Sequence, residues 1–145
     1  MQIPINNRLK RLQHLALAIC TILIFQVSGL NAQSIWEVGD PINGQVLFNT
    51  NCASCHKITD EVLVGPGLAG IQKRWKSSDD MLVQWVQNPQ EAYESGDKYI
   101  KSVVDRYVGT YGWMTGHAVS KEEVGDIMAY VIAPPEDGSA TADSS

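Results

Sequence analysis

This chain has few cysteines and no clear β-strand pattern. Three of the 145 residues are cysteine, and no segment shows the alternating apolar pattern of a strand. A zinc site needs four ligands, and the cysteines fit no usual zinc-finger spacing with His56 and the distant His117. The lack of strands also argues against a redox-active Cys52–Cys55 disulfide, because that motif belongs in a βαβ context.

Long apolar runs are missing as well. The longest, residues 15–27, is interrupted by Thr21 and Gln26 and is shorter than the roughly 18–20 residues that span a bilayer. It follows three basic residues and precedes the small residue Ala32, which is the pattern of a secretory signal peptide. We therefore predict that residues 1–32 are a signal peptide. An uncleaved, tilted membrane anchor is the alternative.

Acidic residues are absent before Gln33, whereas Arg8, Lys10 and Arg11 lie there. The whole chain has a net charge of −5, so removal of these three positive charges leaves −8. Such a charge argues against nucleic acid and anionic lipid as partners. It predicts a soluble protein that meets basic patches on its partner proteins.

The remainder of the chain is long enough for one small domain, which we place at residues 33–133. Residues 134–145 contain only proline, glycine, serine, alanine, threonine and acidic residues. We expect this tail to be disordered, because it has no large apolar side chain to bury. Cys20 is expected to be lost with the signal peptide.

Helical periodicity and capping residues predict an all-α fold with four short helices. Asp40, followed by a proline, suits a helix start, and the pairs Ser77/Asp80 and Ser120/Glu123 resemble capping boxes. The predicted helices cover residues 41–53, 78–88, 96–108 and 121–132. Helices this short are marginal on their own, so they need a shared core.

The most specific motif is Cys52-Ala53-Ser54-Cys55-His56. C-x-x-C-H is the attachment motif of a c-type haem. Two cysteines one helical turn apart suit thioether bonds to the two vinyl groups on one side of a porphyrin. The histidine that follows is then held against the iron as an axial ligand. With the predicted export signal, this motif predicts one covalently bound haem c.

A glycine-rich loop, residues 64–71, follows the motif. Metal-bound histidines donate their second ring N–H to a carbonyl or carboxylate group. Pro66 has a free carbonyl for this purpose, Gly65 and Gly67 permit a close approach of the backbone, and Leu68 can lie on the porphyrin edge. Taken alone, the loop would also fit an ordinary surface turn.

Residues 36–133 resemble a monohaem class I cytochrome c. The residues that carry the resemblance are Gly44, Phe48, Cys52-Ala53-Ser54-Cys55-His56, Gly65-Pro66-Gly67-Leu68, Arg74-Trp75, Met114 and the closing helix over residues 120–130. The resemblance implies an all-α fold wrapped around one haem, with the first and last helices crossing closely at Gly44. It also implies that Phe48 packs near Ile127 and Tyr130, and that the Pro66 carbonyl is the partner of His56.

The iron needs a sixth ligand, for which four residues are candidates: Met81, Met114, Met128 and His117. Met114 lies in an irregular loop before the last helix, where the family places its methionine. Met81 opens the second predicted helix, and Met128 falls on the apolar face of the last one. We predict Met114, with His117 as its competitor. Thr115 departs from the proline that usually follows this methionine in the family.

The haem propionates are negative and need hydrogen-bond donors. The densest basic cluster is Lys73-Arg74-Trp75-Lys76. Arg74 can donate two hydrogen bonds to one carboxylate, and the Trp75 indole N–H can donate another. We predict that both bind the cofactor; a solvated basic turn with one core tryptophan is the alternative.

These residues predict a periplasmic one-electron carrier with His/Met ligation and no small-molecule substrate, whose partners are the redox proteins of a respiratory chain. Residues 85–88, 95–99 and 114–115 are similar to small monohaem subunits of alternative complex III, so a bound subunit of a membrane quinol-oxidising complex is the second prediction. Enzymatic activity is disfavoured, because a dihaem peroxidase needs two attachment motifs and the chain has one.

Overall fold

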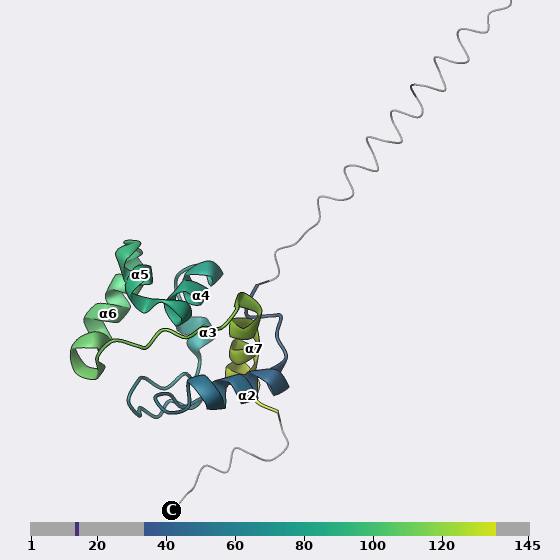
Figure 1. The fold of residues 1–145 in the computed structure, drawn as a ribbon, viewed down its shortest axis with the longest axis horizontal. Helices are drawn as coiled ribbons and strands as arrows, with labels where there is room; N and C mark the ends of the chain where they lie inside the picture. Colours follow the sequence, from purple (N-terminus) through teal and green to yellow (C-terminus); the bar gives the residue numbers. More distant parts are fainter. Residues whose placement is uncertain (1–13, 15–33, 136–145) are drawn as a thin grey trace, which may run out of the picture. The chain divides into compact units, whose positions relative to one another are not determined.

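The computed structural model describes residue 14 and residues 34–135. Over this range the chain forms helices and no strand, apart from a single bridge between His56 and Val62 (Figure 1). The helices are α2 (Pro41–Asn51), α3 (Ile71–Arg74), α4 (Asp79–Gln87), α5 (Pro89–Glu94), α6 (Lys98–Tyr111) and α7 (Lys121–Ile132). The all-α prediction is confirmed.

The predicted signal peptide and tail fall outside the described residues, except for residue 14 and residues 134–135. Their boundaries therefore stay predictions. Within the part of the chain that is described, no helix is both long and apolar enough to cross a bilayer.

The helix starts follow the capping chemistry with one correction. The Asp40 side chain accepts from the Ile42 backbone N–H at 2.9 Å at the start of α2, and Ser120 and Glu123 form the predicted capping box of α7. The cap of α4, however, is Ser78 and not Ser77. The Ser77 hydroxyl instead donates to Asp97, 2.7 Å away, which draws it out of the capping position.

Helices α3 and α5 are absent from the sequence-based prediction. Pro89 ends α4 as expected, but the chain turns directly into α5, with Pro89 at the first helical position. Asn88 closes α4, and its side chain accepts from the Glu91 N–H at 3.3 Å to open α5. One asparagine therefore joins two short helices that the sequence pattern shows only as one.

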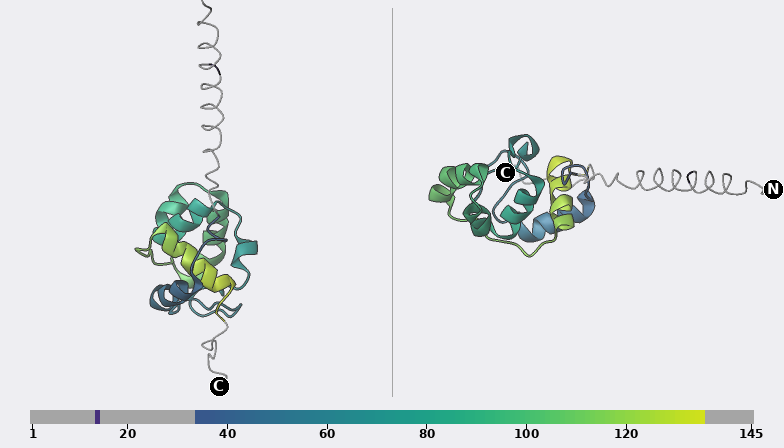
Figure 2. Two further views of the ribbon diagram at one scale, coloured as in Figure 1. Left: turned by 90° about the vertical axis from the view of Figure 1, so that its right-hand side faces the viewer. Right: turned by 90° about the horizontal axis from the view of Figure 1, so that it is seen from above.

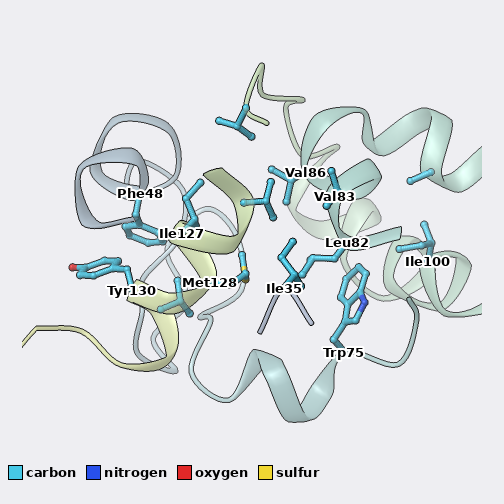
Figure 3. Packing of buried hydrophobic residues seen from close by; sticks show 14 residues of the cluster. Ile35, Phe48, Trp75, Leu82, Val83, Val86, Ile100, Ile127, Met128 and Tyr130 are labelled. Atoms are coloured by element: carbon cyan, nitrogen blue, oxygen red, sulfur yellow. The ribbon is translucent and has the colours of Figure 1, made fainter. Parts of the chain in front are cut away.

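The close crossing of α2 and α7 is confirmed. A Cβ atom on Gly44 would overlap the backbone carbonyl of Asp126, so only glycine permits this approach. The rings of Phe48 and Tyr130 pack with centroids 5.5 Å apart, beside Ile127 (Figure 3). The Asp126 carboxylate also accepts from the Asp40 backbone N–H, at 2.7 Å, which fastens the start of α2 to α7.

Helices α5 and α6 lie on the side of the domain away from α2 and α7, and α4 lies between them and α7 (Figures 1 and 2). Ile100 of α6 and Ala92 of α5 are completely buried, and Leu82 of α4 joins them in one hydrophobic core (Figure 3). Trp75 and Tyr99 meet edge to face at 5.0 Å and connect the end of α3 to α6.

The segment before α2 is held to α4 by a carboxylate. Asp79 accepts hydrogen bonds from the Ser34 hydroxyl and the Ile35 backbone N–H, both at 2.9 Å. Ile35, which is 3% exposed, is thereby fixed in the core.

Gly44→Ala tests the crossing. Because the added methyl group meets backbone rather than a movable side chain, we expect the free energy of unfolding in denaturant to fall by about 1–3 kcal/mol. Gly109→Ala is the matched control: a Cβ there has no heavy atom within 4 Å, and the change should raise stability by about 0.5–1 kcal/mol. Equal effects at the two positions would contradict this account.

Candidate functional site

The C-x-x-C-H motif forms a tight turn at the end of α2. Cys52 caps the helix, with its N–H donating to the Phe48 carbonyl at 2.8 Å. The N–H groups of Cys55 and His56 then both donate to the Cys52 carbonyl, at 3.0 and 2.9 Å. These bonds bring the two sulfurs and the imidazole to the wall of one cavity.

Both cysteine side chains of the motif are free thiols. Burial raises the pKa of the Cys52 thiol to about 11, and the charge of the nearby Cys55 makes a smaller contribution in the same direction. A redox-active dithiol needs a lowered cysteine pKa, because the thiolate is the nucleophile. The environment of Cys52 raises its pKa instead. It therefore does not favour a thioredoxin-like role.

His56 is held by the glycine-proline loop. Its Nδ1 lies 2.8 Å from the Pro66 carbonyl oxygen, and since a carbonyl can only accept, Nδ1 carries the hydrogen. This leaves the lone pair of Nε2 free to bind a metal. A Cβ on Gly65 would lie 2.5 Å from His56 Cε1, so the loop passes the ring at a distance that only glycine allows. The Gly65 N–H donates to the Cys55 carbonyl at 2.7 Å and fixes the loop in place.

The cavity has a volume of about 720 Å³, which is within the roughly 300–1,000 Å³ typical of cofactor sites. It lies between the motif turn and the helices α4, α6 and α7, and its wall is mostly apolar. Of the residues predicted to bind the cofactor or its metal, all line it: Cys52, Cys55, His56, Pro66, Leu68, Arg74, Trp75 and Met114.

The segment that carries Met114 is fastened to the end of α4. The His117 N–H donates to the Val86 carbonyl at 3.0 Å, and the Gln87 side-chain amide donates to the Val119 carbonyl at 2.6 Å. Met114 is half-buried and packs against the core. His117 lines the same cavity, so the fold brings both candidate ligands to it.

The two remaining candidates for the sixth ligand differ in whether they line the cavity. Met128 lines the cavity but is 5% exposed and belongs to the core of α7, as its place on the apolar face predicts. Met81 packs against the core in α4 and is not part of the cavity wall.

The donor role expected for Trp75 is corrected by the structure, and that expected for Arg74 stays a prediction. The Trp75 indole N–H donates to the Ser78 carbonyl at 3.1 Å, so its one donor is already used within the protein. Arg74 Nη2 donates to the Gly67 carbonyl at 2.8 Å, which leaves its other N–H groups available. Trp75 thus contributes ring surface to the cavity, and Arg74 also braces the loop that holds His56.

Sequence reasoning missed Ser102 and Arg106 of α6, which line the cavity one helical turn apart. The Arg106 guanidinium lies 6.0 Å from the centroid of the Tyr107 ring. Their spacing of four residues places them on one face of the helix, which the sequence alone indicates.

The arrangement fits a c-type haem. Two free thiols one turn apart, an imidazole with a free Nε2 and an apolar cavity of cofactor size meet in one place. The family model described as Cytochrome c matches residues 42–132. The chain belongs to the cytochrome c family. It accordingly binds one haem c through Cys52 and Cys55 and functions in electron transfer.

Solved structures of cytochromes c resemble the domain. A cytochrome c from Rhodothermus marinus is 32% identical, with a TM-score of 0.50, over 63% of this chain and 72% of that chain. An engineered cytochrome c from Rhodothermus marinus is 27% identical, with a TM-score of 0.52, over 73% of this chain and 89% of that one. No curated protein gives a significant match. Cytochromes c are electron carriers rather than enzymes.

Gly65→Ala tests the close packing beneath His56. The added methyl group overlaps the imidazole and should break the bond from Nδ1 to the Pro66 carbonyl. Because that bond raises the basicity of the imidazole, its loss should raise the midpoint potential of the haem protein. Redox titration followed by absorbance measures the shift. Gly109→Ala serves as control, and an unchanged potential in Gly65→Ala would contradict the role of this loop.

Proposed function

We propose that this cytochrome c is a monohaem class I carrier that transfers single electrons outside the cytoplasm, with His56 and Met114 as its axial ligands. The observation that carries the proposal is that one cavity is lined both by a histidine with a free Nε2 and by a methionine from a braced loop. When bound, haem c supplies an iron that cycles between the ferric and ferrous states.

The protein groups account for fast electron exchange. The bond from His56 to Pro66 and the close approach of Gly65 fix the imidazole in one orientation. Backbone bonds from residues 117 and 119 to α4 brace the loop of Met114. A site that is rigid in both oxidation states needs little reorganisation. The apolar wall excludes water, which keeps the environment of the iron constant.

Met114 is preferred over His117 because a thioether favours reduced iron and raises the potential, as suits a carrier. Its side chain packs against the hydrophobic core.

The sequence before the domain supports the proposed periplasmic location. Basic residues, an apolar run and Ala32 precede the domain in the order of a signal peptide. Covalent attachment through Cys52 and Cys55 would prevent loss of the cofactor outside the cell. The proposed partners are redox proteins of a respiratory chain.

A place in a quinol-oxidising membrane complex is the second candidate, and it rests on the likeness of residues 85–88, 95–99 and 114–115 to small subunits of alternative complex III. Purification from membranes and from the periplasmic extract separates the two candidates. Recovery with membrane subunits favours the complex, and recovery as a soluble monomer favours the free carrier.

Met114→Ala tests the ligation. The weak red absorption band of ferric haem that reports an iron–thioether bond should disappear, and the midpoint potential should fall. His117→Ala and Met81→Ala are controls that should keep the band. Persistence of the band in Met114→Ala, or its loss in His117→Ala alone, would overturn the assignment.

A further inference from the structure

The segment that carries Met114 runs from α6 to α7 without a helix, and we call residues 112–119 the Met114 loop (Figure 1). The loop contains two glycines, Gly112 and Gly116, and no proline. Its own residues therefore place little restriction on its backbone angles. Most of the loop is exposed, whereas Met114 is half-buried and Val119 is buried. Such a loop holds a side chain in one position only if other elements fix its backbone.

The first anchor of the loop is an aromatic contact directly before Met114. The rings of Trp113 and Tyr93 meet edge to face, with their centroids 5.6 Å apart and their planes at 78°. Tyr93 belongs to α5, packs against the hydrophobic core and is not part of the cavity wall. Gly112 ends α6 at a φ of 78°, a left-handed conformation in which the chain leaves the helix. The position of Trp113 is thereby tied to α5.

The second anchor follows Met114 and begins with a close approach of two backbones. A Cβ atom on Gly116 would overlap the Gln87 carbonyl oxygen and would lie 3.5 Å from Pro89 Cδ. The loop therefore touches the end of α4 and the start of α5 at a distance that only glycine allows.

Two hydrogen bonds complete the second anchor. The His117 N–H donates to the Val86 carbonyl at 3.0 Å, and the Gln87 side-chain amide donates to the Val119 carbonyl at 2.6 Å. Gln87 is exposed and, like Tyr93, lies outside the cavity wall. Its carbonyl and its amide thus contact the two ends of the segment 116–119.

Both anchors belong to the corner at which α4 turns into α5. Asn88 closes α4, and its side chain accepts from the Glu91 N–H at 3.3 Å to open α5. Pro89 follows at the first helical position, where its ring restricts the backbone, and it is fully buried together with Ala92. Since one corner holds residues 113 and 116, it fixes the chain on both sides of the methionine.

We propose that Gln87 and Tyr93 are positioning residues for Met114, because the α4–α5 corner holds the loop so that the thioether stays directed at the iron. The inference rests on the proposed ligation by Met114. A thioether favours reduced iron over ferric iron, so the ferric protein depends most on how firmly the loop is held. Neither residue lines the cavity, and each acts through the loop. The corner sets the population of an open state in which the sixth position is free.

Binding of imidazole to the ferric haem protein measures this open population. Added imidazole takes the sixth position only when Met114 has left it, so the apparent dissociation constant varies inversely with the open fraction. Gln87→Leu removes one hydrogen bond, and Tyr93→Leu removes the ring contact with Trp113. Each change should lower the apparent dissociation constant for imidazole about threefold to tenfold. Without imidazole, both variants should keep the red absorption band of the iron–thioether bond.

Two matched variants serve as controls. Tyr93→Phe keeps the ring, and Gln90→Leu removes a glutamine that is exposed on α5 outside the cavity wall. Both should leave the imidazole dissociation constant unchanged. Unfolding of the same variants in denaturant separates positioning from general stability. A loss of stability in Gln87→Leu and Tyr93→Leu with unchanged imidazole binding would overturn the proposal, and so would an equal effect of Gln90→Leu on that binding.

The red band of Met114→Ala reports the ligation itself and is read separately. If the band persists in Met114→Ala, the proposed ligation fails and the positioning role fails with it. If Met114→Ala loses the band while Gln87→Leu and Tyr93→Leu bind imidazole as the unaltered protein does, the ligation stands and the role of the corner is overturned.

Discussion

The fold depends on a cofactor that completes its hydrophobic core. The helices are six to fourteen residues long, apart from the single turn of α3, and such helices need tertiary packing to persist. Among the helices of residues 34–135, the crossing of α2 and α7 is the one extensive direct contact between helices distant in sequence. Helices α3, α4 and α6 face a cavity of about 720 Å³, which haem c bonded to Cys52 and Cys55 would fill. The same apolar group therefore supplies both core and function.

The features that the sequence predicted correctly are those whose chemistry is local. The C-x-x-C-H turn, the capping box of Ser120 with Glu123 and the α2–α7 crossing at Gly44 each follow from residue types at short, fixed spacings or from a family resemblance built on them. The features that it missed depend on the path of the backbone between α3 and α4. Ser77 is drawn from its capping position by Asp97, and the indole N–H of Trp75 is taken by Ser78. The residue pattern of a single helix does not predict such a bond.

The net charge of the chain likewise does not show where its charged residues lie in the fold. The sum over the sequence describes an acidic protein, yet the fold gathers Lys73, Lys76 and Arg106 at one cavity from segments up to thirty-three residues apart. Since screening limits the reach of a charge to about 10 Å at 0.1 M salt, the field at the cavity depends on where these residues lie rather than on the net charge.

Calorimetric unfolding of the haem-free chain tests most directly whether the cofactor completes the core. Replacing Cys52 and Cys55 with alanine prevents covalent attachment, and the purified chain is then compared with the haem protein. The account predicts a sharp heat-absorption peak for the haem protein and a broad transition without cooperative heat absorption for the haem-free chain, as in a molten globule. A sharp cooperative peak in the haem-free chain would contradict it.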